Sequence, residues 1–187
     1  MDVLEKILGA LLSTVDPLLN SISDHFLAQA PINYRVFIPE KSLQDRDMTI
    51  IDMINSVGHE AVSFCICDPD QKDCPIIFAS DGFCNFTGYA FTDIEGKNCR
   101  FLQGPGTKKD DVDKIRKAVK EETETSVNLL NYRKDGTPFN NQFFLSPLRD
   151  PSGKLSYYIG VQCSVETLGP GQAPQNIGWV YTQGLHA

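Results

Sequence analysis

The sequence predicts an α+β fold, with a five-stranded antiparallel sheet, flanking helices and an N-terminal helical cap. Three observations indicate this class. Five apolar runs are typical of strands, two before a block of helical segments and three after it. The last three runs are joined by tight-turn sequences at 134–137 and 150–153, which favour antiparallel neighbours. Near the start of the chain, leucine and isoleucine recur at three- and four-residue steps, as in amphipathic helices.

The N-terminal segment, residues 1–30, is predicted to form amphipathic helices, with Asp16 and Pro17 starting the second one. Two interpretations of its wide apolar face stay open. The helices pack as a pair on the core of their own domain, or they form a surface for a partner protein. A membrane-surface helix is disfavoured because Lys6 is the only lysine or arginine before Arg35.

Residues 31–60 are predicted to hold a latch segment and a cap helix. The apolar stretch 31–39 is bounded by prolines, which suits an extended segment packed on a surface. The linker and latch are expected to run to residue 47. An amphipathic helix is then predicted at 48–57, with Gly58 as its end.

The main domain is predicted to span residues 61–166, followed by a linker-like tail at 167–187. Its expected strands lie at 61–67, 75–79, 126–133, 138–148 and 155–164, and its expected helical segments at 81–86, 92–93 and 108–122. The last of these helices is charged, and Val112, Ile115 and Val119 are expected on its inner face.

Composition argues against several function classes. The 187-residue chain carries a formal net charge of -7 at pH 7, which disfavours direct binding to nucleic acid and docking on anionic lipid. No apolar run approaches the roughly 20 residues that a membrane span needs. The N-terminus also lacks the basic region of a secretory signal. We therefore expect an intracellular protein, cytoplasmic or nuclear.

The chain has six cysteines, but a domain this rich in core residues does not need disulfides, and a reducing compartment is expected. Cys65 and Cys67 are separated by one residue, and no second cysteine or histidine pair has the spacing of a zinc finger. The sequence therefore predicts no metal site. Because alternate residues of a strand share a face, Cys65 and Cys67 are expected to point the same way.

The segment with the most reactive and hydrogen-bonding groups is 96–103, Gly-Lys-Asn-Cys-Arg-Phe-Leu-Gln. Cys99 offers a nucleophilic sulfur, and Arg100 offers a planar fork suited to a phosphate. The flanking amides of Asn98 and Gln103 can donate and accept hydrogen bonds, and the two apolar residues are expected to face inward. Together these groups suit a bound nucleotide-like cofactor better than a hydrolytic reaction.

This segment resembles the GxNCRFLQ motif of LOV domains, the flavin-binding blue-light sensors of the PAS superfamily. The order of strands and helices over about residues 61–166 is also similar to that family. The resemblance implies that Cys99 is photoreactive: in blue light its sulfur adds to carbon C4a of a flavin, and the adduct breaks again in the dark. The cofactor would carry the difficult chemistry, and the protein would supply position, dryness and hydrogen bonds.

The resemblance also implies the kind of flavin. In LOV domains, arginines at the positions of Arg100 and Arg116 hold the flavin phosphate. This favours FMN, because a dianion is held well by two guanidinium forks. FAD and riboflavin remain alternatives.

Three amides are predicted on neighbouring strands: Asn131, Asn141 and Gln162. A buried strand amide is costly unless it is paired, so either the backbone satisfies each one or all three face one polar ligand. In LOV domains the asparagines bind the pyrimidine edge of the flavin, and the glutamine that matches Gln162 senses a ring nitrogen and relays the signal. Further residues expected at the cofactor are Cys67, Asn98, Leu102, Gln103, Ile115, Phe143 and Leu145.

Some positions depart from the plant phototropin pattern. Cys67 stands where those domains usually carry a hydroxyl or aliphatic residue, Cys74 where they carry an amide, and Asn140 where a tryptophan is common. The run 67–75 instead resembles fungal Vivid-type short LOV proteins, although Vivid has a longer loop after the motif than this chain.

The sequence thus predicts a blue-light photoreceptor that is not an enzyme. Its expected output is a change in association, as a light-dependent homodimer or with a protein partner, through residues 1–57 or 167–187. One alternative is a flavin-dependent redox protein, although a nicotinamide fingerprint and a C-x-x-C pair are missing. The other is a PAS interaction module without photochemistry, which would contain no flavin.

Overall fold

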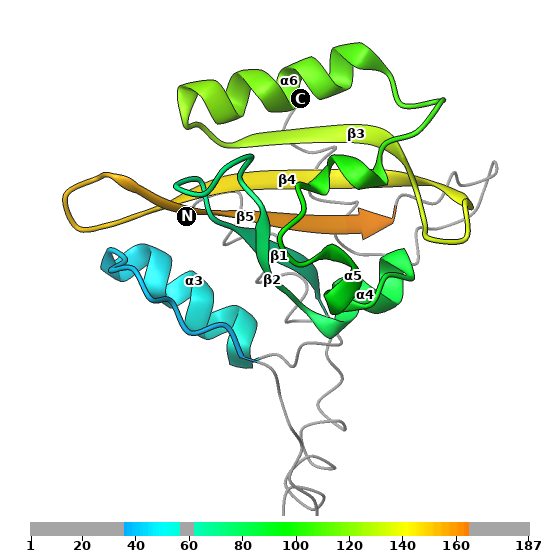
Figure 1. Ribbon diagram of the computed structural model, residues 1–187. Coiled ribbons are helices and arrows are strands. Elements are labelled where there is room, and N and C mark those ends of the chain that lie inside the picture. The colour runs from blue at the N-terminus through cyan, green and yellow to red at the C-terminus, as the bar shows by residue number, and fades with distance from the viewer. Residues whose placement is uncertain (1–35, 57–61, 165–187) are drawn as a thin grey trace, which may run out of the picture.

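The computed structural model describes residues 36–56 and 62–164, which form one antiparallel sheet with helices packed against it (Figure 1). The elements are α3 (Asp45–Ser56), β1 (Ser63–Cys67), β2 (Ile76–Ala79), α4 (Asp81–Thr87), α5 (Phe91–Ile94), the 3-10 helix η1 (Cys99–Leu102), α6 (Lys109–Glu121), β3 (Thr125–Tyr132), β4 (Pro138–Arg149) and β5 (Leu155–Ser164). The five strands lie in the order β2-β1-β5-β4-β3, and every neighbouring pair is antiparallel. The predicted α+β class is confirmed.

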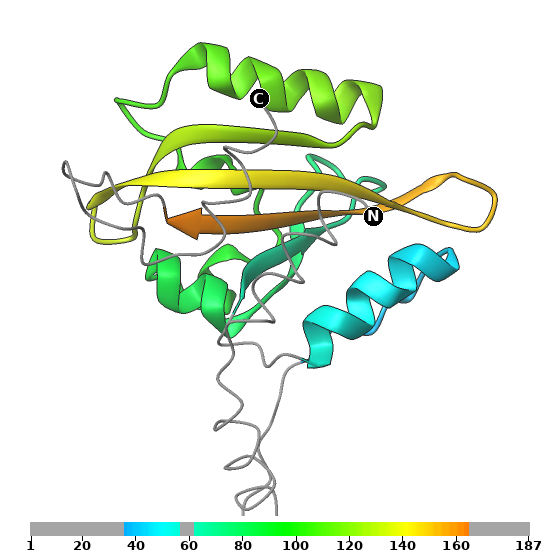
Figure 2. The ribbon, with the colours of Figure 1, turned by 180° about the vertical axis from the view of Figure 1, so that it is seen from behind.

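The sheet is covered on both faces. We call inner the face that packs against α4, α5, η1 and α6; α4 and α5 lie in front of the strands in Figure 1 and behind them in Figure 2. The outer face packs against α3 and the residues before it. Because strand side chains alternate, Phe64 and Ile66 of β1 enter the outer core, whereas Cys65 and Cys67 enter the inner one.

The predicted strands and helices of the main domain agree with the observed ones to within two residues. Gly136 and Gly153 in the two hairpin turns both have the positive φ that such turns require. The expected inner face of α6 is wrong at Val119, which is 39% exposed, while Ala118 is buried. The hydroxyl of Tyr158 in β5 donates to the Val119 carbonyl at 3.0 Å, so the end of α6 is held at the sheet by its backbone.

Helix α3 begins at Asp45, three residues before its predicted start at 48. The carbonyl of Gln44 accepts hydrogen bonds from the amides of residues 47 and 48, which starts the helix there. The carboxylate of Asp47 is buried and accepts the backbone N–H of Arg149 at 2.6 Å and the side-chain amide of Gln44 at 2.8 Å. This first turn is polar in sequence, so hydrophobic periodicity does not reveal it.

Several predictions fall on residues outside the described part of the chain. These are the helices at 1–30, the first residues of the latch at 31–35, the helix end at Gly58 and the tail at 167–187. Among the helices of the described part, none has the length and apolar character to cross a bilayer.

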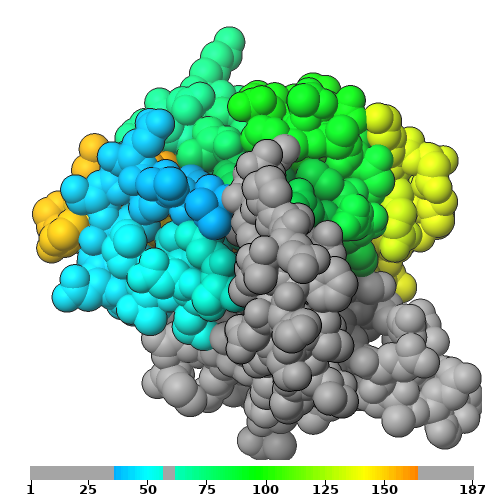
Figure 3. Space-filling view, turned by 90° about the horizontal axis from the view of Figure 1, so that it is seen from below, coloured from blue at the N-terminus to red at the C-terminus, as the bar shows by residue number. Residues whose placement is uncertain are grey.

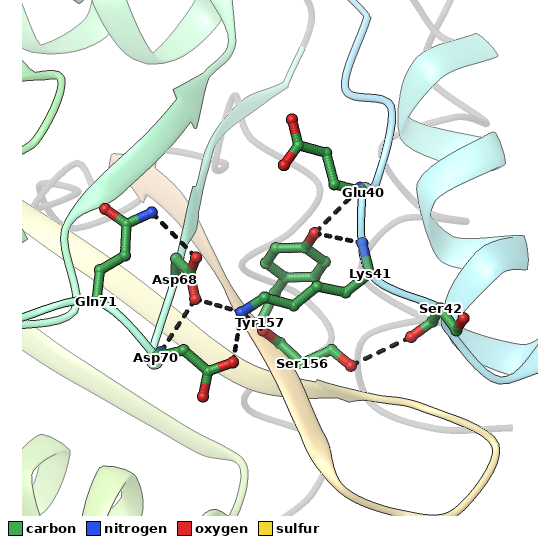
Figure 4. A network of polar contacts seen from close by, with 8 residues as sticks. All are labelled: Glu40, Lys41, Ser42, Asp68, Asp70, Gln71, Ser156 and Tyr157. Atoms are coloured by element: carbon green, nitrogen blue, oxygen red, sulfur yellow. Dashed lines mark hydrogen bonds and ion pairs between the residues drawn. The ribbon is translucent and has the colours of Figure 1, made fainter.

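The latch segment, which we define as residues 36–44, is held by the ammonium group of Lys41 (Figure 4). This group contacts the carboxylates of Asp68 and Asp70, the latter at 2.9 Å. Burial alone would raise the pKa of Asp68, but hydrogen bonds from Lys41 and from the following loop outweigh it and hold that pKa below its ordinary value. The latch is therefore attached to the loop that directly follows β1.

Tyr157 of β5 makes the second attachment of the latch. Its hydroxyl accepts hydrogen bonds from the backbone N–H groups of Glu40 (3.1 Å) and Lys41 (2.9 Å), and its ring meets that of Phe37 edge-on, with centroids 5.5 Å apart. The backbone N–H and carbonyl of Phe37 in turn bind the side chain of Asn55 in α3, at 3.2 and 2.9 Å. Figure 3 shows the latch and α3 together beside the β4–β5 turn.

Ser80 joins the sheet to α4. Its hydroxyl is fully buried, donates to the Val62 carbonyl at 2.7 Å, and accepts the backbone N–H groups of Phe64 and Phe83, both at 3.0 Å. One side chain thus caps α4 and fixes the start of β1.

Replacing Ser80 by alanine is expected to lower the free energy of unfolding by about 2–3 kcal/mol, because two buried donors and one acceptor lose their partner. Denaturant titration measures this loss. Ser56→Ala is the matched control, since the exposed Ser56 hydroxyl bonds to the Met53 carbonyl in its own helix, and it should change stability by at most about 0.5 kcal/mol. Equal effects of the two substitutions would contradict the role given to Ser80.

Lys41→Met is expected to raise the pKa of Asp68 toward its ordinary value and to destabilise the protein at neutral pH. A carboxylate whose folded-state pKa is lowered stabilises the fold above its unfolded pKa, about 4, and this stabilisation is lost as the pH falls through the folded value. The stability difference between wild type and variant should therefore shrink below about pH 4. Unfolding measured across this range tests it, with the exposed Lys114→Met as control. A difference that does not depend on pH would refute the assignment.

Candidate functional site

Three cysteine sulfurs meet on the inner face of the sheet. The Cys99 Sγ lies 3.7 Å from the Cys65 Sγ and 3.7 Å from the Cys67 Sγ. Cys65 and Cys67 are buried, and Cys99 is half-buried at the start of η1. The expectation that Cys65 and Cys67 share a face is confirmed. Because side chains alternate along a strand, both thiols reach Cys99.

The motif segment folds against β2 for local reasons. Gly96 has a φ of +74°, which a side chain would strain, and its N–H donates to the Ile76 carbonyl at 2.9 Å. The Ile76 N–H donates to the Lys97 carbonyl at 2.9 Å. Asn98 then caps η1, its Oδ1 accepting the Arg100 N–H at 3.1 Å. Hydrogen bonds therefore hold the segment in place both before Asn98, at Gly96 and Lys97, and after it, at Arg100.

Asn98 also fixes the loop 68–74 that follows β1. Its Nδ2 donates to the carbonyls of Asp73 at 2.7 Å and of Cys74 at 3.4 Å. Both loop residues have left-handed φ angles, +71° and +48°, which non-glycine residues rarely adopt. Asn98 was predicted to contact a cofactor, and in this structure its amide holds the backbone around Cys99.

The contacts among the three sulfurs shift the pKa of each thiol. Hydrogen bonds from Cys65 and then Cys67 to the Cys99 sulfur hold the pKa of Cys99 well below its ordinary value, although burial acts in the opposite direction. The neighbouring thiols, Cys65 first and then Cys74 and Cys99, raise the pKa of Cys67 well above its ordinary value. Cys99 is therefore the sulfur of this group that carries a negative charge most readily.

Two buried strand asparagines face each other on the inner face of the sheet. The Nδ2 of Asn141 in β4 donates to the Oδ1 of Asn131 in β3 at 2.9 Å. The Oδ1 of Asn141 is buried and has no hydrogen-bond partner among residues 36–56 and 62–164. An unpaired buried acceptor costs about 1–3 kcal/mol, so this oxygen indicates the place of a ligand donor.

Gln162 in β5 lies opposite Ser63, at the start of β1, and contacts Cys65. Its Oε1 accepts the Ser63 hydroxyl at 3.3 Å, while its Nε2 donates to the Gly160 carbonyl at 3.2 Å and to the Cys65 sulfur at 3.9 Å. Gln162 thus contacts Cys65 directly, and Cys65 in turn contacts Cys99.

The predicted apolar contacts are brought together with the amides. Leu102, Phe143 and Leu145 are buried in the inner core with the cysteines, and Ile115 of α6 packs against them. Gln103 is half-buried where η1 ends. The inner face therefore combines one apolar surface with three strand amides and three thiols.

The two arginines are not brought together by any contact in the described structure. Arg100 forms an exposed bidentate pair with Asp73, with one N–O distance of 2.8 Å. Arg116 pairs with Asp113 at 2.8 Å within α6 and is also exposed. A phosphate held by both would have to replace these carboxylates.

The sequence-based residue set lacks three contributors. Cys65 contacts Cys99, and its position two residues before Cys67 in a strand was the available signal. Gly160 lies under Phe143, where a Cβ atom would come within 2.9 Å of the ring; a glycine in the middle of a strand indicates such close packing. Asp73 pairs with Arg100 across 27 residues, and no sequence pattern marks it.

Comparison with known proteins places the chain in a family. Residues 61–163 match the PAS domain family. Phototropin-2 of Oryza sativa subsp. japonica is 47% identical over 124 residues, which cover 66% of this chain and 14% of that protein. The light-state structure of the blue-light photoreceptor Aureochrome1 LOV is 43% identical with a TM-score of 0.55, covering 67% of this chain and 91% of that one.

The fungal photoreceptor VVD, in a Cys71Val variant, is 34% identical with a TM-score of 0.54, covering 56% of this chain and 77% of that one. The match to Phototropin-2 involves only a small part of the larger protein, so it concerns the domain and not the whole receptor. On these grounds, together with the motif and the sheet that carries it, the chain belongs to the PAS domain family, and its residues 61–163 are a domain of the LOV type.

Proposed function

We propose that this chain is a blue-light photoreceptor that holds a flavin, FMN, on the inner face of its sheet, with Cys99 as the photoreactive thiol. The observation that carries the proposal is the buried Oδ1 of Asn141, which has no partner within the described part of the chain and lies next to Asn131, on the same face as the thiol cluster. A fold does not by itself imply a function, so the argument depends on this site.

The donor set of the site fits the polar edge of a flavin ring. That edge carries one N–H donor between two carbonyl acceptors, and an asparagine can complement both kinds of group. The free Oδ1 of Asn141 would accept the N–H, and amide nitrogens of Asn131 and Asn141 could donate to the carbonyls. Leu102, Phe143 and Leu145 offer the apolar surface that a flat ring needs.

The phosphate of FMN would be held at the surface by Arg100 and Arg116. Both guanidinium groups are exposed, and each pairs with a carboxylate of its own. Exchanging two carboxylates for one dianion keeps each arginine paired, and such bidentate contacts are strong. This charge pairing supports FMN over riboflavin.

A bound flavin would supply blue-light absorption and an electrophilic ring carbon. The protein would supply the nucleophile: Cys99 is half-buried, has a lowered pKa, and is fixed in place by the cap at Asn98. The thiols of Cys65 and Cys67, each 3.7 Å away, would donate to a negatively charged Cys99 sulfur and so stabilise it. Burial of the cluster keeps water from competing with the thiol.

Gln162 would convert this local change into a change of the sheet. Its amide holds the Ser63 hydroxyl with one end and the Cys65 sulfur with the other, so rotating the amide exchanges a donor for an acceptor at both contacts. Both partners belong to β1, and β1 leads directly into Asp68, which holds Lys41 of the latch. The proposed output is release of the latch and a change in association with a second copy or another protein, not catalysis.

The central test is the absorption spectrum of the purified protein before and after blue light and during dark recovery. We expect a flavin band that bleaches and recovers in the wild type, and a band that stays unchanged in Cys99→Ala. Cys163→Ala is the control, because this thiol on β5 lies outside the cluster. A flavin band that never bleaches would favour a redox protein, and absence of flavin would favour a PAS interaction module.

Gln162→Leu is expected to keep the bleaching but to abolish the light-driven change in hydrodynamic radius, because leucine cannot exchange donor and acceptor. Gln142→Leu is the matched control, since Gln142 lies on the outer side of β4 and bonds Ser126. Small-angle scattering or size-exclusion chromatography in dark and light measures the change. If Gln162→Leu responds to light as the wild type does, the relay is elsewhere.

A further inference from the structure

We propose that Cys65, Cys67 and Cys99 form a binding site for a thiophilic d10 metal ion, Zn(II) or Cu(I). The three sulfur atoms all lie within 4.8 Å of one another, and two of the separations are 3.7 Å. Two ligands come from neighbouring positions on one face of β1, and the third comes from η1 across the inner core. This cluster is additional to the amides and arginines discussed above.

The separations match those of a thiolate metal site. With a metal–sulfur bond of about 2.3 Å, the ligand sulfurs are about 3.8 Å apart in tetrahedral geometry and about 4.0 Å apart in trigonal geometry. The two separations of 3.7 Å that involve Cys99 need a shift of only a few tenths of an ångström, and the third separation, between Cys65 and Cys67, is at most 4.8 Å. Soft thiolate ligands select Zn(II) and Cu(I) over hard cations such as Mg(II) and Ca(II).

The surroundings suit coordinated thiolates. The amide nitrogen of Gln162 points at the Cys65 sulfur from 3.9 Å, as the outer hydrogen bonds of metal sites do. The Arg100 guanidinium lies close enough to favour a charged Cys99. The Cys74 thiol packs against the same inner core and lies outside the group of three sulfurs. Binding would release the protons of the three thiols to solvent, so its affinity must fall as the pH falls.

A disulfide is the rival use of the same sulfurs. It joins only two of them, at about 2.05 Å, and requires an oxidant to take up two electrons. The two equal contacts of Cys99 select neither Cys65 nor Cys67 as a single partner. Three sulfurs around one point favour coordination, in which no electrons are transferred.

The consequence for light sensing depends on the proposed function. A metal on the cluster occupies the Cys99 sulfur, so the metal-bound protein should not bleach in blue light although it still contains flavin. The cluster would then make the light response depend on the supply of thiophilic metal.

The test is a titration of the flavin-containing protein, in the dark and without oxygen, with Cd(II) as a d10 probe, followed by competition with Zn(II) and with Cu(I). Ultraviolet sulfur-to-metal charge-transfer absorption reports binding, and competition shows which physiological ion binds more tightly. We expect one ion per wild-type chain. Cys65→Ala and Cys67→Ala should weaken binding by about tenfold or more, and Cys163→Ala should leave it unchanged. Thermal unfolding without metal confirms that each variant is folded.

Absence of charge-transfer absorption, or equal binding by the cluster variants and wild type, would overturn the proposal. Loss of two free thiols among the three without metal, detected by mass spectrometry after alkylation, would overturn it in favour of a disulfide. Bleaching is measured separately on metal-free and metal-loaded protein. Failure of the metal-free protein to bleach refutes the photoreceptor function alone, whereas bleaching of the fully loaded protein refutes the proposed coordination of Cys99.

Discussion

The structure depends on one constraint: the central strands β1 and β5 must bury both of their faces. Phe64 and Ile66 serve the outer core, and the residues between and after them serve the inner core. A slip of one residue would exchange the two sets, placing cysteines under α3 and aromatic rings at the site. The register of β1 against β5, with Ser63 opposite Gln162, therefore fixes the latch side and the reactive side together.

The loop 68–74 connects the latch to the segment that carries Cys99. It starts at Asp68, which binds the latch through Lys41, and ends at Asp73 and Cys74, whose carbonyls bind Asn98 beside the reactive cysteine. The latch and the motif segment thus contact the same seven residues from opposite ends. This gives a physical connection between the inner face and the N-terminal elements, which lie on the other side of the sheet.

Much of the fold could be predicted from the sequence, because periodicity and turn chemistry act locally. The hairpin glycines at 136 and 153 and the alternation in β1 are examples. The start of α3 could not be predicted, because it depends on the buried contact of Asp47 with Arg149, 102 residues away. Val119 was assigned to the wrong face because helical spacing ignores how the end of α6 is held by Tyr158.

The candidate site could likewise be predicted where it depends on local sequence, and not where it depends on long-range contacts. Residue types and a motif pointed to Cys99 and to the three strand amides, which the fold places on one face. The meeting of three sulfurs could not be foreseen, because spacing rules for metal sites consider ligands close in sequence, and Cys99 lies 32 residues after Cys67. The pairing of Arg100 with Asp73 likewise results from the folded loop.

The buried Oδ1 of Asn141 has a consequence for the stability and the abundance of the protein in the cell. Without cofactor, this buried oxygen has no hydrogen-bond donor among the residues that the structure describes, while a ligand that supplies the donor binds only the folded form. Cofactor supply then acts on the folding equilibrium as well as on occupancy. When the cofactor is scarce, more of the chain is unfolded at any moment and exposed to proteases, so the amount of receptor would follow the amount of cofactor available to it.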